Sequence, residues 1–337
     1  AGEAAYVRAG FGSRTMSLIA GWLVIVSGVV ASAAIAIGCA GYIRTFVDLP
    51  LSVVVTAVIL TMGLVAAWGI VESVLLAAVF TINEAGGLLV LIYAGFSHDS
   101  ELILRAPETI PPIAELGIWL GIANASLLAV FAFIGFEDMV NVAEEVRDPV
   151  RNLPRAILIA LFVSTALYFL VALAAVASAP VAELAAADAP LAWLYLHMTG
   201  REPYAITLIS LFAVINGALI QLIMASRVGY GMARRGWLPA VFGRVSATTR
   251  TPVFATVCVS MLLLVMALWL PLETLAKATS YFLLIVFALV NLSLWRLKRL
   301  AAHPAGVIRV PAWVPMAGGI ASALFVLSQS LLDLGFI

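Results

Sequence analysis

The sequence is poor in charge. Only 11% of its 337 residues are Asp, Glu, Lys or Arg, whereas 64% are hydrophobic, and the mean hydropathy is +1.13. Soluble domains carry about 25% charged and about 45–50% apolar residues, so this composition excludes a soluble domain and predicts an integral membrane protein. The net charge is zero, and no basic stripe interleaved with aromatic residues is present. That pattern disfavours nucleic acid as a partner.

Cysteine and histidine are also scarce. Cys39 and Cys258 both lie inside apolar runs, which is typical of small core residues rather than of a disulfide or a metal ligand. The three histidines fall far apart in expected loops (His98, His197 and His303). No group has the spacing of metal ligands, and no glycine-rich phosphate loop is present. We therefore expect no metal ion, no cofactor and no enzymatic activity.

Long apolar runs dominate the chain instead. A membrane-spanning helix needs about 20 mostly apolar residues. Nine segments meet this criterion: Ser17–Val47, Leu51–Trp68, Ser73–Ala94, Ile113–Phe136, Ile157–Ala179, Tyr204–Ser226, Val253–Leu270, Leu275–Leu294 and Val314–Leu332. We predict an all-α, polytopic membrane protein with one transmembrane domain over 1–337. Cytoplasmic loops are expected at 137–156 and 227–252.

The basic residues predict the orientation of these spans. If the N-terminus is cytoplasmic, fourteen Lys and Arg residues lie inside and only four lie outside (Arg44, Arg105, Arg201 and Lys277). Such an excess on the cytoplasmic side follows the positive-inside rule. We therefore expect a multi-pass protein of the cytoplasmic (inner) membrane with the N-terminus of this chain inside. The chain begins in a polar stretch without Met and without a signal-peptide pattern, so we expect it to be N-terminally incomplete.

Polar residues at membrane depth are the candidates for function. Glu84 lies near the middle of its span, where a carboxylate is costly unless it is protonated or faces a polar cavity. It is a candidate proton carrier, and the alternative is a protonated acid that hydrogen-bonds a neighbouring helix. Asn216 interrupts another span and favours a ligand contact or an interhelical hydrogen bond equally.

A face of small residues runs along the first span. Gly28, Ser32, Ile35 and Cys39 recur at steps of three and four, which usually indicates close helix packing. The same face can also line a cavity.

The stretch FAFIGFEDMVNVAEEVRDPVRNLPRAI, from Phe131 to Ile157, interrupts the fourth span. The span weakens at Gly135 and then meets Glu137 and Asp138 directly. Irregular backbone at membrane depth is tolerated where it is buried in protein or lines a water-filled cavity, and transporters bind charged substrates at such breaks. The alternative is a helix that ends normally at the cytoplasmic surface.

The same stretch resembles the signature of the amino acid–polyamine–organocation (APC) superfamily of permeases. GEAAYVRAGFGSRTMSLIAGW, NGALIQLIMASRVGYGMARRGWLP and TSYFLLIVFALVNLSLWRLKR resemble three further family segments, in the same order. The resemblance covers nearly the whole chain and implies a LeuT-type inverted-repeat helical bundle. It equates the nine spans with family helices three to eleven, so the first two helices and a twelfth are not in this sequence.

The resemblance also implies site residues. Substrate would contact the broken segment formed by Phe131, Ala132, Phe133, Ile134 and Gly135. Ser32 and Ile35 match cavity-facing positions, Glu84 falls where relatives carry a lysine, and Asn216 is a further candidate. The acids and arginines after the break (Glu144, Glu145, Arg147, Arg151 and Arg155) suggest an ion-pair latch.

The resemblance implies secondary transport of an amino acid or related amine across a lipid membrane by alternating access. Protons are a candidate co-substrate. The alternative is a permease-derived sensor or scaffold without transport activity. The sequence leaves the oligomeric state open.

Overall fold

The computed structural model describes residues 2–69, 74–104, 107, 110–140, 146–300 and 310–333. In these residues the chain forms helices and no strand. The long helices are α2 (Arg14–Arg44), α3 (Leu51–Trp68), α4 (Val74–His98), α5 (Leu116–Ala132), α6 (Pro149–Ser178), α9 (Tyr204–Arg234), α10 (Val253–Trp269), α11 (Leu272–Leu300) and α12 (Trp313–Asp333). The short ones are α1 (Glu3–Phe11), η2 (Phe136–Val140), α7 (Val181–Ala186), α8 (Pro190–Thr199) and η4 (Ala240–Gly243).

The predicted all-α, polytopic architecture is confirmed. Eight helices in the described part of the chain are long and apolar enough to cross a membrane. α10 is the shorter ninth, because its 17 residues lie at the lower limit of spanning length. Every predicted span therefore falls on a helix.

The helix ends differ from the ends of the apolar runs. α9 continues to Arg234, past the expected start of the loop at 227, and α6 already begins at Pro149 rather than at Ile157. Hydropathy reports where side chains change from apolar to polar, whereas the backbone hydrogen bonds of a helix continue through polar residues. The segments between these helices are consequently shorter than the sequence suggested.

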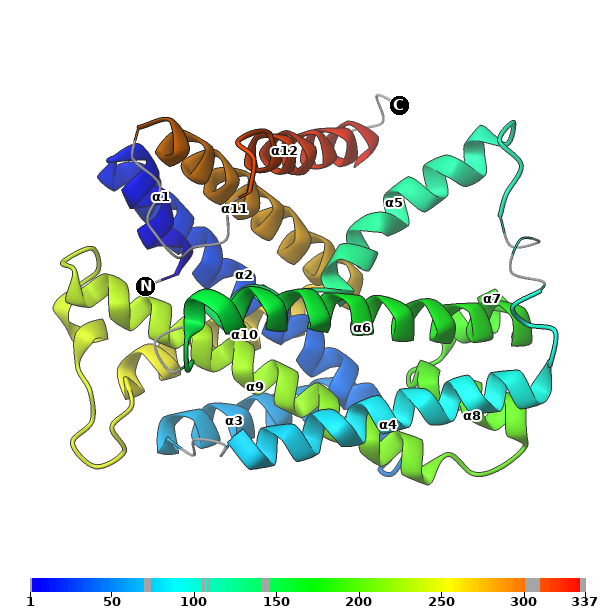
Figure 1. Cartoon of the computed structure of the whole chain (residues 1–337). Coiled ribbons are helices and arrows are strands. Elements are labelled where there is room, and N and C mark those ends of the chain that lie inside the picture. Colours follow the sequence, from blue (N-terminus) through cyan, green and yellow to red (C-terminus); the bar gives the residue numbers. More distant parts are fainter. Residues whose placement is uncertain are drawn as a thin grey trace.

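α2 is the central helix of the molecule (Figure 1). In its most apolar stretch 67% of the residues are buried, against 6% in the corresponding stretches of α5 and α6. Its buried side chains are mostly Ala, Gly, Ser and Val. Small side chains allow backbones to approach closely, which is the main source of helix association where lipid removes the hydrophobic effect.

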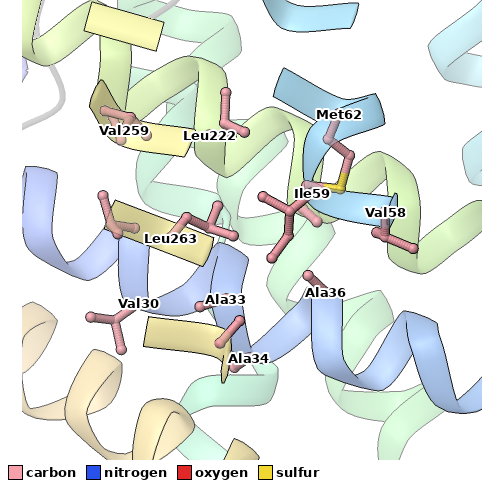
Figure 2. Close-up of a cluster of buried hydrophobic side chains, with 14 of the residues drawn as sticks. Val30, Ala33, Ala34, Ala36, Val58, Ile59, Met62, Leu222, Val259 and Leu263 are labelled. Atoms are coloured by element: carbon pink, nitrogen blue, oxygen red, sulfur yellow. The ribbon is translucent and has the colours of Figure 1, made fainter. Parts of the chain in front are cut away.

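The largest core lies where α2 meets α3, α9 and α10. Figure 2 shows Ala33, Ala34 and Ala36 of α2 beside the larger side chains Ile59, Leu222 and Leu263 of these three neighbours. All six are at most 1% exposed. The small residues on one helix thus leave room for the large residues on the others, so the side chains of the four helices pack closely.

The Ser32 hydroxyl adds a polar contact to this packing. It is fully buried and donates a hydrogen bond to the carbonyl of Ala218 on α9, at 2.8 Å. Gly28, one turn earlier, lies so close to α9 that an added Cβ would be 3.3 Å from the Cβ of Ala225. The face of small residues therefore serves close packing, and Gly28 also lines a small cavity, so both interpretations of its pattern apply.

α1 packs across α2 and α11 (Figure 1). The Ser17 hydroxyl donates to the carbonyl of Ala4 at 2.6 Å, and the guanidinium of Arg296 lies 5.6 Å from the ring centre of Phe11. Gly10 faces α11 so closely that a Cβ there would lie 2.5 Å from the Cβ of Ser293. This approach requires glycine, because both backbones would have to separate for any larger residue.

We predict that Gly10→Ala lowers the free energy of unfolding by about 1–3 kcal/mol, the usual cost of overpacking. The measurement is thermal unfolding of the purified protein in detergent. Gly121→Ala is the matched control, because a Cβ at Gly121 meets nothing within 4 Å. Equal melting temperatures for the two variants would contradict the close approach of α1 and α11.

Candidate functional site

The break predicted after Phe131 is present. α5 ends at Ala132, Gly135 takes a φ of 130°, and the short 3₁₀ helix η2 begins at Phe136. A φ in this region strains every residue with a side chain, so Gly135 is required for the turn.

The backbone of the break is only partly hydrogen-bonded. The amides of Phe133 and Ile134 donate to Val130 and Phe131, at 3.0 and 3.2 Å. Within the described residues, the carbonyls of Ala132, Phe133 and Ile134 accept no backbone hydrogen bond. Three consecutive free carbonyls create a concentrated negative potential, and the C-terminal end of the α5 dipole adds to it.

The two acids that follow the break, Glu137 and Asp138, form hydrogen bonds around it. Glu137 is 8% exposed and its Oε2 accepts a hydrogen bond from the amide of Gly135 at 2.8 Å. Asp138 accepts a hydrogen bond from the amide side chain of Gln221 on α9, at 2.8 Å. The two acids at membrane depth thus hold the turn and connect it to α9.

The three aromatic rings of the break point to different helices. Phe131 packs against the main core. The Phe133 ring meets Tyr168 of α6 edge-on at 5.2 Å, and the Phe136 ring lies 5.6 Å from Phe287 of α11. Each ring therefore connects the break to a different part of the structure.

The other predicted site residues fall into two groups. Ile35 packs against the same core as Phe131, whereas the hydroxyl of Ser32 is already used in the bond to α9. Oδ1 of Asn216 is buried and, in the described part of the structure, has no hydrogen-bond partner. An acceptor left open in this way is a candidate ligand contact, whereas Ser32 has a structural role in this conformation.

Glu84 is connected to the break through α6. Glu84 lies on α4, and the Tyr168 ring of α6 contacts the Phe133 ring. α4 and α6 pack against each other along this region.

Sequence reasoning missed one residue of this region, Glu3. It is 6% exposed on α1 and, with Glu137, Asp138 and Gln221, lines a cavity of about 10 Å³. That volume holds about one water molecule. An isolated acid in the polar opening stretch carried no signal in the sequence, because only the packing of α1 brings it to the break. Among the described residues, no group of His, Cys, Asp or Glu is arranged to hold a metal ion.

The predicted latch of acids and arginines lies partly outside the described residues, since Glu144 and Glu145 belong to 141–145. Arg147, Arg151 and Arg155 are described and are exposed. The latch stays a hypothesis.

Eight apolar helices of spanning length, with a break between α5 and η2 in one candidate span, define a polytopic membrane protein, and broken helices of this kind are typical of transporters. The comparison with known proteins agrees with that class. The family model described as "Amino acid permease" matches residues 1–335. The chain belongs to this family, whose activity is amino acid transport, as the resemblance of its motifs implied.

Relatives of known name support the assignment. The chain is 27% identical to the branched-chain amino acid permease BcaP of Bacillus subtilis, over 96% of this chain and 72% of the relative. It is 25% identical to the methylthioribose transporter of Bacillus subtilis, over 92% of this chain and 69% of the relative. It is 32% identical to the vacuolar cationic amino acid transporter 2 of Arabidopsis thaliana, over 53% of this chain and 28% of the relative.

A pH-dependent stability is predicted for Glu3. Burial raises the pKa of this carboxyl, against a smaller opposite effect of its own backbone amide. A raised folded-state pKa means that the acid destabilises the fold once the pH exceeds its unfolded pKa, and has no effect well below it. Glu3→Gln should therefore raise the melting temperature at pH 8 and have a smaller effect at pH 5.

The exposed Glu183 supplies the control for this experiment. Glu183→Gln should leave the melting temperature unchanged at both pH values. An equal gain from Glu3→Gln at pH 5 and pH 8 would show that the charge of Glu3 is not the cause.

Proposed function

We propose that the chain forms the translocating part of a secondary amino acid transporter that works by alternating access, with the break Phe131–Gly135 as its substrate site. One observation carries this proposal: among the described residues, three consecutive backbone carbonyls at the break have no backbone partner. Free carbonyls in lipid are costly, so a fold retains them only where a polar ligand or water satisfies them.

The chemistry of the break suits an α-ammonium group. Carbonyl oxygens accept hydrogen bonds, an ammonium donates three, and the C-terminal end of α5 adds a favourable dipole. Oδ1 of Asn216 would offer one more acceptor. The relatives named above carry branched-chain amino acids, cationic amino acids or methylthioribose, and the shared requirement of the amino acids among these substrates is their amino group.

Proton coupling at Glu84 is the second element of the proposal. A mid-membrane carboxyl changes charge at a lower cost when polar groups are near, and Glu84 lies on α4, which packs against α6, the helix that carries Tyr168. Because Tyr168 contacts Phe133, protonation of Glu84 would bias the position of the break. Substrate binding and proton binding would then act on the same segment.

The test of transport uses the full-length protein in proteoliposomes, supplied with labelled neutral, cationic and acidic amino acids and with amines one at a time. Saturable uptake of one class is the expected result. The absence of saturable uptake of every compound would contradict transport and support a sensor or scaffold instead.

Glu84→Gln tests the coupling separately. We expect uptake driven by an inward proton gradient to fall at least tenfold, because glutamine keeps the shape of glutamate but binds no proton, while exchange of internal for external substrate persists. Glu115→Gln at the exposed start of α5 is the control and should transport like the wild type. If Glu84→Gln retains gradient-driven uptake, Glu84 is a structural residue.

We also propose that residue 2 and the segment 235–252 lie on the cytoplasmic side of the inner membrane, as the fourteen-to-four distribution of basic residues requires. Single cysteines introduced at Ser246 and Arg201 should react differently with a membrane-impermeant maleimide in intact cells. Only Arg201→Cys should be labelled from outside, and labelling of Ser246→Cys instead would reverse the orientation.

A further inference from the structure

The outer half of the broken helix has few packing contacts. α5 diverges from the other helices toward its start (Figure 1), and in its apolar stretch only 6% of the residues are buried. Leu127 is the single buried residue of α5. The position of this helix, and hence of the break at its end, must therefore depend on a small number of contacts near Leu127.

Three polar side chains from α11 and α12 reach α5 at this point. The Ser280 hydroxyl donates to the carbonyl of Leu127 at 2.7 Å, and the Gln329 amide donates to the carbonyl of Ala123 at 2.6 Å. The Lys277 ammonium donates to Oδ1 of Asn124 at 3.0 Å. Positions 123 and 127 are one turn apart, so these contacts lie on one face of α5.

The two carbonyls are unusual acceptors. A carbonyl within a helix already accepts a bond from the amide four residues later, and a second donor must use its other lone pair. For Leu127 that amide belongs to Phe131, the first residue of the break. Ser280 therefore contacts the last regular turn before the chain becomes irregular.

Burial of these donors argues against an accidental contact. Ser280 is 0% exposed and Gln329 is 1% exposed. Oε1 of Gln329 is buried and has no hydrogen-bond partner within the described residues, so the amide is held by its bond to α5 alone. A buried amide with only one of its polar atoms hydrogen-bonded is less favourable for folding than an apolar side chain of the same size. We therefore interpret Gln329 as a residue that positions α5 rather than one that stabilises the fold.

We propose that Ser280 and Gln329 are positioning residues of the substrate site: they fix the outer half of the broken helix against α11 and α12, and so fix where the free carbonyls lie. The inference rests on the proposed function in one respect, namely that the break binds the substrate. Lys277 reinforces the same attachment nearer the outer end and is also paired with Glu273 at 2.9 Å.

The chain offers closely matched controls. Thr279 precedes Ser280, is equally buried, and donates only within its own helix, to the carbonyl of Leu275 at 2.9 Å. Ser330 follows Gln329 and likewise donates within α12, to Val326 at 2.8 Å. Thr279→Val and Ser330→Ala therefore remove a hydroxyl at almost the same place without removing a bond to α5.

The first readout is the kinetics of uptake by the full-length protein in proteoliposomes. Ser280→Ala and Gln329→Met should each raise KM about fivefold, the size expected for loss of one hydrogen bond. Vmax should stay within about twofold, because the amount of folded protein is unchanged. Thr279→Val and Ser330→Ala should leave both constants unchanged, and Ser280→Thr, which restores a hydroxyl, should restore KM.

The second readout does not depend on transport. In a cysteine-free background, Asn124→Cys and Lys277→Cys replace the third contact with a pair that a short bifunctional maleimide can join. The rate of cross-linking should fall at least threefold when Ser280→Ala and Gln329→Met are added together, and should not change with the two control substitutions.

The two readouts separate the possible failures. Equal KM and equal cross-linking in the test and control variants would overturn the proposal, as would a fall in Vmax at constant KM. If the wild type takes up no amino acid, the proposed function fails, while the cross-linking rates still decide whether α11 and α12 hold α5.

Discussion

Everything at the candidate site depends on one constraint: a backbone polar group at membrane depth must have a partner. Among the described residues, the carbonyls of Ala132, Phe133 and Ile134 have none from the backbone, because Gly135 turns the chain before the next helical turn can supply amides. The described residues around the break supply no backbone donor to these carbonyls. Glu137 and Asp138 use the amides of Gly135 and Gln221, so the bonds that stabilise the turn leave the carbonyls available.

The frame that holds the break is built in two different ways. On one side, α2 and α9 approach closely through small residues, and Ser32 adds a hydrogen bond between them. On the other side, α5 is nearly unburied and meets α11 and α12 through polar contacts. Close packing gives a rigid body, whereas a few hydrogen bonds hold a helix in place and still permit movement. An alternating-access transporter needs both properties on opposite sides of its substrate.

The sequence pointed to polar residues in apolar helices as candidates for function, but it did not distinguish their uses. Ser32 and Asn216 both interrupt apolar helices, yet the hydroxyl of Ser32 is bonded to Ala218 and the Oδ1 of Asn216 is open. No pattern in the sequence singled out Ser280 and Gln329, although both donate hydrogen bonds to carbonyls of α5. Whether a side chain has a partner depends on the neighbouring helix, and no periodicity within one helix reveals that.

The sequence by itself determined the class of the protein. The length and hydropathy of its apolar runs dictate membrane helices, because about 20 apolar residues are needed to cross the hydrocarbon core. The Gly135 region and the motif that follows it located the break and indicated the family. The tertiary structure alone decided which helix is central, which carbonyls remain free, and that Glu3 joins Glu137 and Asp138 around one small cavity. The physical reason is that hydropathy is a property of each residue, whereas burial and hydrogen bonding are properties of pairs that lie far apart in the chain.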